Sequence, residues 1–309
     1  MNEEIYRPVS DGLSKKNALI KRYPDGTYHV TCFSRPTYRR GGLEDADKLY
    51  KERRRKEFRE KHSELLEADK PTETTQRADN ARRAKNAIFD ISACNDWQYF
   101  VTLTLDASKV DRYDAKQIVR PVTKWFDNMV QRKGLKYLIV PERHKDGAIH
   151  FHGLIAGDGL RLSDSGTVKV PGRKKPIKRK TAKQYKIPES DWKTVYNWDD
   201  FKLGYSTALA VYGERSTLAK YMTKYITKDL SKIFGKSYFA GGHGLQRKPK
   251  SVALDLDYKK ITAAEFQLPL ELGAVKYYKL PSSEALNDFL LEVAQPLTAS
   301  EARGLFLDD

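Results

Sequence analysis

Cysteine and long apolar runs are scarce in this chain of 309 residues. Its only two cysteines, Cys32 and Cys94, lie too far apart in the sequence for a C-x-x-C knuckle and are too few for a disulfide framework, so a reducing compartment is expected. The first residues lack the basic and then apolar pattern of a signal sequence. No run approaches the roughly 18 apolar residues that a membrane span needs. We therefore expect a cytoplasmic protein with no membrane partner.

Acidic residues are few relative to basic ones. The chain has 57 Lys and Arg against 41 Asp and Glu, which gives a net charge of +16. The excess lies in residues 1–254, because residues 255–309 contain ten acidic and only five basic side chains. This balance favours a polyanionic partner, with binding that weakens steeply as salt rises. A merely soluble basic protein is the alternative on charge alone.

Histidine is also rare, yet two of the six histidines stand close together, as His150-Phe-His152. Side chains alternate between the two faces of a β-strand, so both imidazoles would point to the same side. They form a candidate pair of nitrogen ligands for a metal. Two histidines on a half-buried strand, with no ligand role, are the alternative.

The turn before this strand decides whether a carboxylate joins the two histidines. Residues 146–147, Asp-Gly, are a hairpin signal that follows another apolar run. If the loop has three residues, 145–147, Glu142 pairs with His150 and shares the face of both imidazoles. Two nitrogens and one oxygen then suit a divalent metal with open positions. A two-residue loop would send Glu142 to the other face.

Tyrosine and lysine recur at helical spacing within residues 216–233, as Tyr221 with Lys224 and Tyr225 with Lys228. An apolar face would seat the helix, while the two phenols and two ammonium groups share an adjoining side. A free phenol ionises only well above neutral pH, so a neighbouring ammonium group would favour the nucleophilic phenolate. An amphipathic helix with half-packed tyrosines is the alternative.

The remaining patterns indicate an α+β protein. Residues 97–106 are rich in β-branched and aromatic side chains and predict a central buried strand, and residues 111–133 have the spacing of a helix that covers one sheet face. We expect an N-terminal hairpin and charged helix at 1–78, a main domain at 79–257, and an acidic, helical C-terminal tail at 258–309.

The segment 165–188 contains nine Lys and Arg and no acidic residue. A loop of this length is usually functional or disordered. We interpret it as a mobile basic arm on a nucleic-acid backbone, with a plain disordered insert as the alternative. The candidate DNA-binding residues are Arg173, Lys174, Lys175, Lys178, Arg179 and Lys180.

Together, these motifs resemble those of the HUH endonucleases. The chain most resembles the two-tyrosine replication initiators of microvirus-type phages and the related replication-associated proteins of Gram-positive plasmids and prophages. The resemblance covers roughly residues 80–255. It implies an antiparallel sheet of about five strands backed by helices, with Mg²⁺ or Mn²⁺ as cofactor. It also implies that His150, His152 and Glu142 are metal ligands, and that Tyr221 and Tyr225 are nucleophiles assisted by Lys224 and Lys228.

The implied activity is initiation of rolling-circle replication. A tyrosine nicks single-stranded DNA at an origin, keeps a 5′-phosphotyrosine link, releases a 3′-hydroxyl primer, and rejoins the strand at termination. The chain has no G-x-x-x-x-G-K-S/T loop, so a host helicase and a host polymerase are expected partners in a bacterial cell or phage-infected host. The alternatives are a conjugative relaxase or mobilisation nickase, a nucleic-acid-binding regulator without chemistry, and a structural protein of a mobile element.

Overall fold

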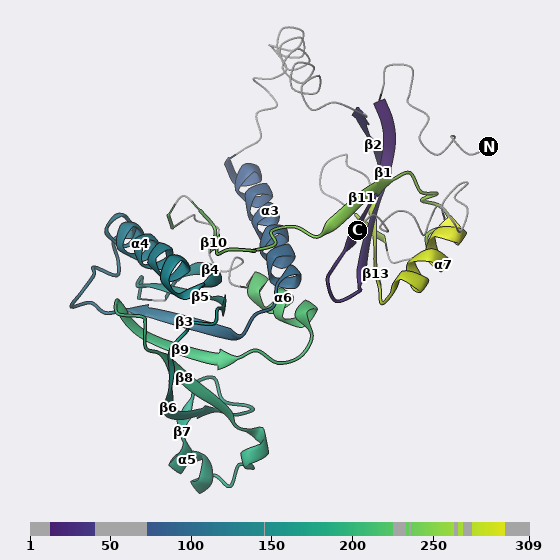
Figure 1. Ribbon diagram of the computed structural model, residues 1–309. Coiled ribbons are helices and arrows are strands. Elements are labelled where there is room, and N and C mark those ends of the chain that lie inside the picture. The colour runs from purple at the N-terminus through teal and green to yellow at the C-terminus, as the bar shows by residue number, and fades with distance from the viewer. Residues whose placement is uncertain are drawn as a thin grey trace. The chain divides into compact units, whose positions relative to one another are not determined.

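The computed structural model describes residues 13–40, 73–144, 146–224, 233–234, 236–262, 265–267 and 274–293. They fall into two compact units (Figure 1). The central unit is residues 73–248, and the terminal unit combines residues 1–72 with 249–309. The charged helix expected at 43–68 lies outside the described residues. None of the described helices is both long enough and apolar enough to cross a membrane.

The central unit is a mixed α+β structure. In chain order its elements are α3 (Glu73–Cys94), β3 (Tyr99–Leu105), α4 (Ala115–Lys133), β4 (Lys136–Arg143), β5 (Ile149–Ala156), β6 (Leu162–Lys169), β7 (Ile177–Lys178), α5 (Arg179–Gln184), η2 (Glu189–Asp191), β8 (Lys193–Trp198), β9 (Gly204–Ala210), α6 (Arg215–Thr223) and β10 (Phe239–Gly241). The strands form one antiparallel sheet in the order β10-β4-β5-β3-β9-β8-β6-β7. The strand expected at 97–106 is therefore confirmed as an interior strand, β3.

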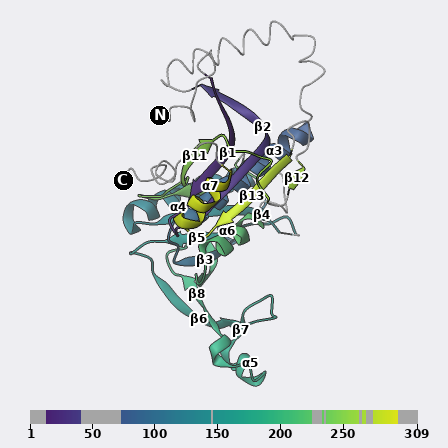
Figure 2. The same ribbon diagram turned by 90° about the vertical axis from the view of Figure 1, so that its right-hand side faces the viewer.

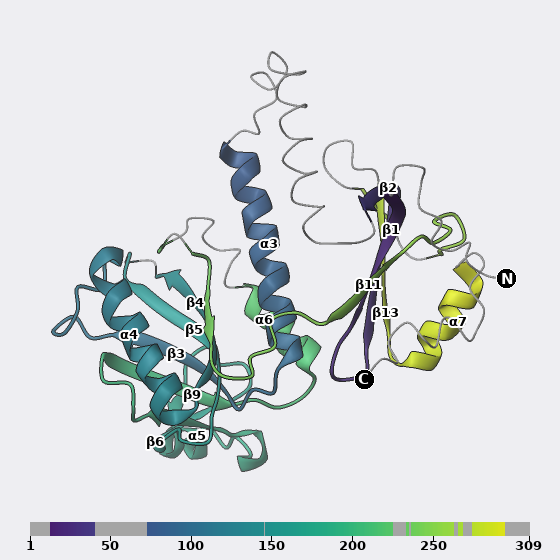
Figure 3. The ribbon, with the colours of Figure 1, turned by 45° about the horizontal axis from the view of Figure 1, so that its top comes forward.

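Helices pack on both faces of this sheet (Figure 3). Helix α4 has the predicted periodicity, and its buried side chains lie against Val101, Leu103 and other apolar residues of one face. Helices α3 and α6 share a second apolar cluster with the opposite face, to which Leu138 and Leu154 contribute. The candidate histidines lie on this second face, because His152 alternates with Leu154 along β5.

The sheet has eight strands rather than about five, because the basic segment is folded. Residues 165–188, expected as a mobile arm, instead include the end of β6, all of β7 and helix α5, and they extend the sheet beyond β8. Figure 2 shows these elements projecting from the rest of the unit. Apolar residues scattered among the lysines build a small core of their own, namely Val168, Val170, Ile177, Ala182, Ile187 and Trp192.

The terminal unit joins the two ends of the chain. Its strands are β1 (Leu13–Arg22), β2 (Tyr28–Arg40), β11 (Lys250–Leu254), β12 (Glu265–Gln267) and β13 (Ala274–Leu280), followed by α7 (Ser283–Val293). They form an antiparallel sheet in the order β11-β1-β2-β13-β12. The structure therefore divides the chain differently from the expected regions 1–78, 79–257 and 258–309. The hairpin is confirmed but is not an outlying appendage, and the acidic tail contributes strands as well as the expected helix at 283–293.

Both cysteines are free thiols and buried. Cys32 lies in the apolar core of the terminal unit together with Ile20 and Val30. Burial raises the pKa of the Cys32 thiol to about 12. The absence of a disulfide framework, expected from the sequence, is thereby confirmed.

Candidate active site

The β4–β5 hairpin closes with the odd loop that the metal hypothesis requires. The backbone N–H of His144 donates to the carbonyl of Ala148 at 2.8 Å. Gly147 lies between them with φ of +88°, a conformation that favours glycine. The register pairs Glu142 with His150. The predicted three-residue loop is therefore confirmed, and Glu142 shares a sheet face with both histidines.

Two threonines on the neighbouring strand β3 hold the imidazoles. Thr102 pairs in register with His152 and Thr104 with His150. The threonine hydroxyls lie 3.1 Å from Nδ1 of His152 and 3.3 Å from Nδ1 of His150. A ring whose Nδ1–H donates to such a hydroxyl keeps its lone pair on Nε2, the atom left to bind a ligand. The sequence analysis did not assign this role, although threonines two apart in a strand were a visible signal.

The Glu142 carboxylate contacts one of the two imidazoles. Its Oε2 lies 2.9 Å from Nε2 of His152, and the two side chains are only 14% and 16% exposed. As placed, the three candidate ligands do not form a coordination shell: across the described parts of the chain, no three His, Cys, Asp or Glu side chains are close enough together to hold a metal ion. The donor set of two imidazoles and one carboxylate on one face nevertheless suits a divalent cation.

The surroundings of His150 favour its neutral form. Burial lowers the pKa of His150, and the adjacent His144 lowers that pKa further. The two rings stack with their centroids 5.1 Å apart. A neutral imidazole is the form that binds metal, so this environment is compatible with a ligand role.

Helix α6 places Tyr221 beside the histidine face. The helix is seated by Ala219 and Met222, both fully buried, while Tyr221 remains 42% exposed. The Tyr221 ring meets Phe100 edge-on at 5.3 Å, and Phe100 in turn stacks 6.3 Å from His152. One aromatic ring therefore bridges the phenol and the nearer imidazole.

The lysine that follows Tyr221 by three residues also lies close to it. The ammonium nitrogen of Lys224 is 5.6 Å from the centre of the Tyr221 ring. The second pair of the motif, Tyr225 and Lys228, lies outside the described residues. The structure thus brings Tyr221 and Lys224 together near His152.

The basic candidates lie at the far end of the sheet. Strands β9, β8 and β6 stand between β3 and the folded segment that carries Arg173, Lys174, Lys175, Lys178, Arg179 and Lys180. The Arg173 guanidinium stacks on the Tyr185 ring at 4.2 Å. Arg179 is paired with Asp164 at 2.5 Å. The other four side chains are exposed. None of the six contacts the histidines.

An exposed tyrosine completes the row of side chains that contains the metal candidates. Tyr205 of β9 pairs with Thr104, so Glu142, His150, Thr104 and Tyr205 follow one another across four strands. The Tyr205 side chain is 69% exposed. Sequence reasoning missed it, because only the strand order places β9 beside β3.

These features define an α+β domain with a histidine pair, a carboxylate and a tyrosine helix on one sheet face. Residues 98–230 match the model of a family of replication-associated proteins, described as the ORF2 type. The match spans somewhat less than half of the chain and contains all seven candidate metal and catalytic residues. No curated protein and no solved structure matches the chain.

Proposed function

We propose that this protein is a rolling-circle replication initiator, which nicks and rejoins single-stranded DNA at an origin through a tyrosine nucleophile. The observation that carries the proposal is the bridge from His152 through Phe100 to Tyr221 on the sheet face that also holds His150 and Glu142. The family match over residues 98–230 supports a role in replication.

In this proposal Mg²⁺ or Mn²⁺ is held by the histidine Nε2 atoms and Glu142. When bound, the cation polarises the non-bridging oxygens of the scissile phosphate and stabilises the charge that builds in the transition state. Thr102 and Thr104 fix the orientation of the imidazoles. They thereby keep the ligand atoms turned toward the substrate side of the sheet.

Tyr221 supplies the nucleophile. Its oxygen forms a bond to phosphorus while the bond from phosphorus to the 3′ oxygen breaks, which leaves a 5′-phosphotyrosine and a free 3′-hydroxyl. Lys224 stabilises negative charge on the phenol oxygen and the phosphate. Because the phosphodiester is exchanged and not hydrolysed, the 3′-hydroxyl can reverse the reaction. Tyr225, four residues later, is the proposed second nucleophile.

The proposal also implies partners and a location. The released 3′-hydroxyl would prime a host polymerase, and a host helicase would unwind the template. Both enzymes act in the cytoplasm of a bacterial cell or phage-infected host. The basic residues of the folded segment 165–188 would hold the DNA backbone, with the salt dependence of phosphate contacts.

Incubation of the purified protein with circular single-stranded DNA and Mn²⁺ tests this function. The account expects a denaturation-resistant protein band shifted by covalently attached DNA. Binding without an adduct would instead support a regulator that lacks chemistry. Sequencing the nicked sites of a plasmid library then separates a replication initiator, cutting at replication origins, from a relaxase, cutting at transfer origins.

Replacing Thr102 and Thr104 together with valine should weaken Mn²⁺ binding. Removal of such orienting partners typically costs about 10- to 100-fold in metal affinity, and valine keeps the shape of threonine. Calorimetric titration with Mn²⁺ measures the change. Thr207→Val is the matched control, since Thr207 lies beside Thr102 on β9. Equal affinity in the double variant and the control would remove the threonines from the metal site.

Replacing Tyr205 with alanine should weaken binding of single-stranded DNA. An exposed aromatic ring beside the histidines suits stacking against a base, and such a contact is worth about 1–3 kcal/mol. Tyr205→Phe keeps the ring and should bind nearly as well as the unchanged protein. Fluorescence anisotropy with a labelled oligonucleotide compares the two variants. Equal loss in both would point to the hydroxyl and exclude stacking.

A further inference from the structure

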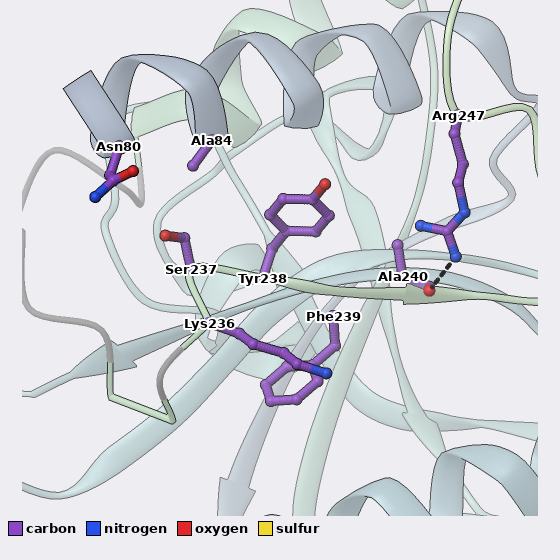
Figure 4. A pocket seen from close by; sticks show the side chains of 8 residues that line it. All are labelled: Asn80, Ala84, Lys236, Ser237, Tyr238, Phe239, Ala240 and Arg247. Carbon is purple, nitrogen blue, oxygen red and sulfur yellow. Dashed lines mark hydrogen bonds between the residues drawn. The ribbon is translucent and has the colours of Figure 1, made fainter. Parts of the chain in front are cut away.

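A cavity of about 460 Å³ lies between α3 and β10 in the central unit (Figure 4). Asn80 and Ala84 of α3 line one wall, and residues 236–240 with Arg247 line the rest. Ala240 pairs with Leu138 of β4, whose side chain belongs to the apolar cluster beneath α3. The cavity therefore opens on the face of the sheet that carries the histidines.

The lining of this cavity is cationic and polar. Lys236 and Arg247 contribute two positive charges, and none of the lining residues is acidic. The Arg247 guanidinium is held by a 2.8 Å hydrogen bond to the carbonyl of Ala240. Such a lining attracts an anion.

Three further polar side chains line the cavity without a partner in the described structure. Asn80, Ser237 and Tyr238 make no side-chain hydrogen bond to any other described residue, so their donors and acceptors are available to a ligand. Figure 4 shows Asn80 and Ser237 at one end, Arg247 at the other, and the Tyr238 ring between them. A few convergent polar groups in a hollow of this size are typical of a small-molecule site.

The position of the cavity in the sheet suggests which ligand it takes. Strand β10 borders β4, which carries Glu142, while β9 with Tyr205 borders β3 on the other side of the histidines. The cavity and Tyr205 therefore flank the candidate site. A single DNA strand that crosses the sheet would meet Tyr205, the histidines and the cavity in turn.

We propose that this cavity binds one nucleotide of the single strand next to the bond that is cut. Its phosphate lies between Lys236 and Arg247, and its base lies against Tyr238 with polar edges toward Asn80 and Ser237. This inference rests on the proposed handling of DNA and adds a subsite to it. The cavity differs from the histidine centre and from the basic segment 165–188.

Charge reversal at Lys236 tests the subsite. Binding of a labelled single-stranded oligonucleotide is measured by anisotropy in EDTA, so that no strand is cut. Lys236→Glu should weaken binding about tenfold, as loss of a charged phosphate contact does, and should reduce the slope of log affinity against log salt by about 0.7. Lys124→Glu is the control, because it makes the same charge change at an exposed position of α4, across the sheet.

A second variant and a competition arm make the result specific. Asn80→Asp, at an exposed position of α3, should also weaken binding, since it replaces an amide donor with a negative charge. Free deoxynucleotide should compete with the oligonucleotide only poorly. Strong competition by it would make a free nucleotide the occupant and overturn the proposal.

Equal affinities in Lys236→Glu, Asn80→Asp and Lys124→Glu would also overturn it. That outcome would leave the proposed nicking function untouched, because adduct formation is scored separately with Mn²⁺. Conversely, a protein that forms no adduct but loses DNA affinity on Lys236→Glu would retain the subsite and lose the nickase proposal. Matched circular dichroism spectra confirm that the variants are folded.

Discussion

Replacing Tyr221 and Tyr225 together with phenylalanine should abolish the covalent protein–DNA adduct. Phenylalanine preserves the ring that packs edge-on against Phe100 but removes the oxygen that forms the bond to phosphorus. The loss should therefore be complete to the detection limit of a denaturing gel, while affinity for single-stranded DNA in EDTA stays within about twofold of the unchanged protein, because a removed exposed hydroxyl changes binding little.

The single variants divide the roles of the two phenols. We expect at least one of Tyr221→Phe and Tyr225→Phe to retain the adduct, since either oxygen could serve as nucleophile. Tyr212→Phe is the control, because Tyr212 is 73% exposed and lies before helix α6. Persistence of the adduct in the double variant would assign the chemistry to another residue.

Replacing His150 and His152 together with alanine should reduce nicking by roughly 1000-fold or more. A Lewis-acidic cation contributes several kcal/mol to transition-state stabilisation, and each 1.36 kcal/mol corresponds to a factor of ten in rate. Single-turnover nicking of an origin oligonucleotide with saturating Mn²⁺ measures the effect. Addition of EDTA to the unchanged protein should produce a loss of the same order.

His243→Ala provides the matched control for the histidine variants. His243 is exposed in a turn and belongs to neither the hairpin nor α6. It should therefore nick at the normal rate and bind Mn²⁺ normally by calorimetry. Normal nicking in the double-histidine variant, or nicking that EDTA leaves unchanged, would rule out a metal held by this pair.

The geometry of the β4–β5 hairpin could be predicted because its determinants are local. Alternation along the strand places His150 and His152 on one face, and the odd loop around Gly147 sets the register with Glu142. Helix α4 and the first turns of α6 could likewise be predicted from apolar spacing, since each depends on side chains within a few turns of one another.

The partners of the histidines could not be predicted, because they depend on pairing between distant segments. Thr102 and His152 are fifty residues apart, and only the antiparallel alignment of β3 with β5 brings them into contact. The same reason applies to Tyr205, and to the terminal sheet, where Tyr28 of β2 pairs with Leu280 of β13. Local periodicity carries no information about such alignments.

The basic segment was misjudged because its composition hides its core. Lysine and arginine dominate residues 165–188, and the apolar residues among them, such as Val168 and Ala182, follow neither a strand nor a helix period for long. They become a core only when β6, β7 and α5 fold against one another. A charge count alone therefore predicted an arm where the structure has a small module.

The most direct test of the account is to identify the residue that carries the DNA. After reaction of the unchanged protein with an origin strand and Mn²⁺, nuclease and protease digestion followed by mass spectrometry locates the attached nucleotide. The account predicts a 5′-phosphate ester on Tyr221 or Tyr225. Attachment outside helix α6 and the residues that follow it, or a cut strand with a free 5′-phosphate and no adduct, would contradict it.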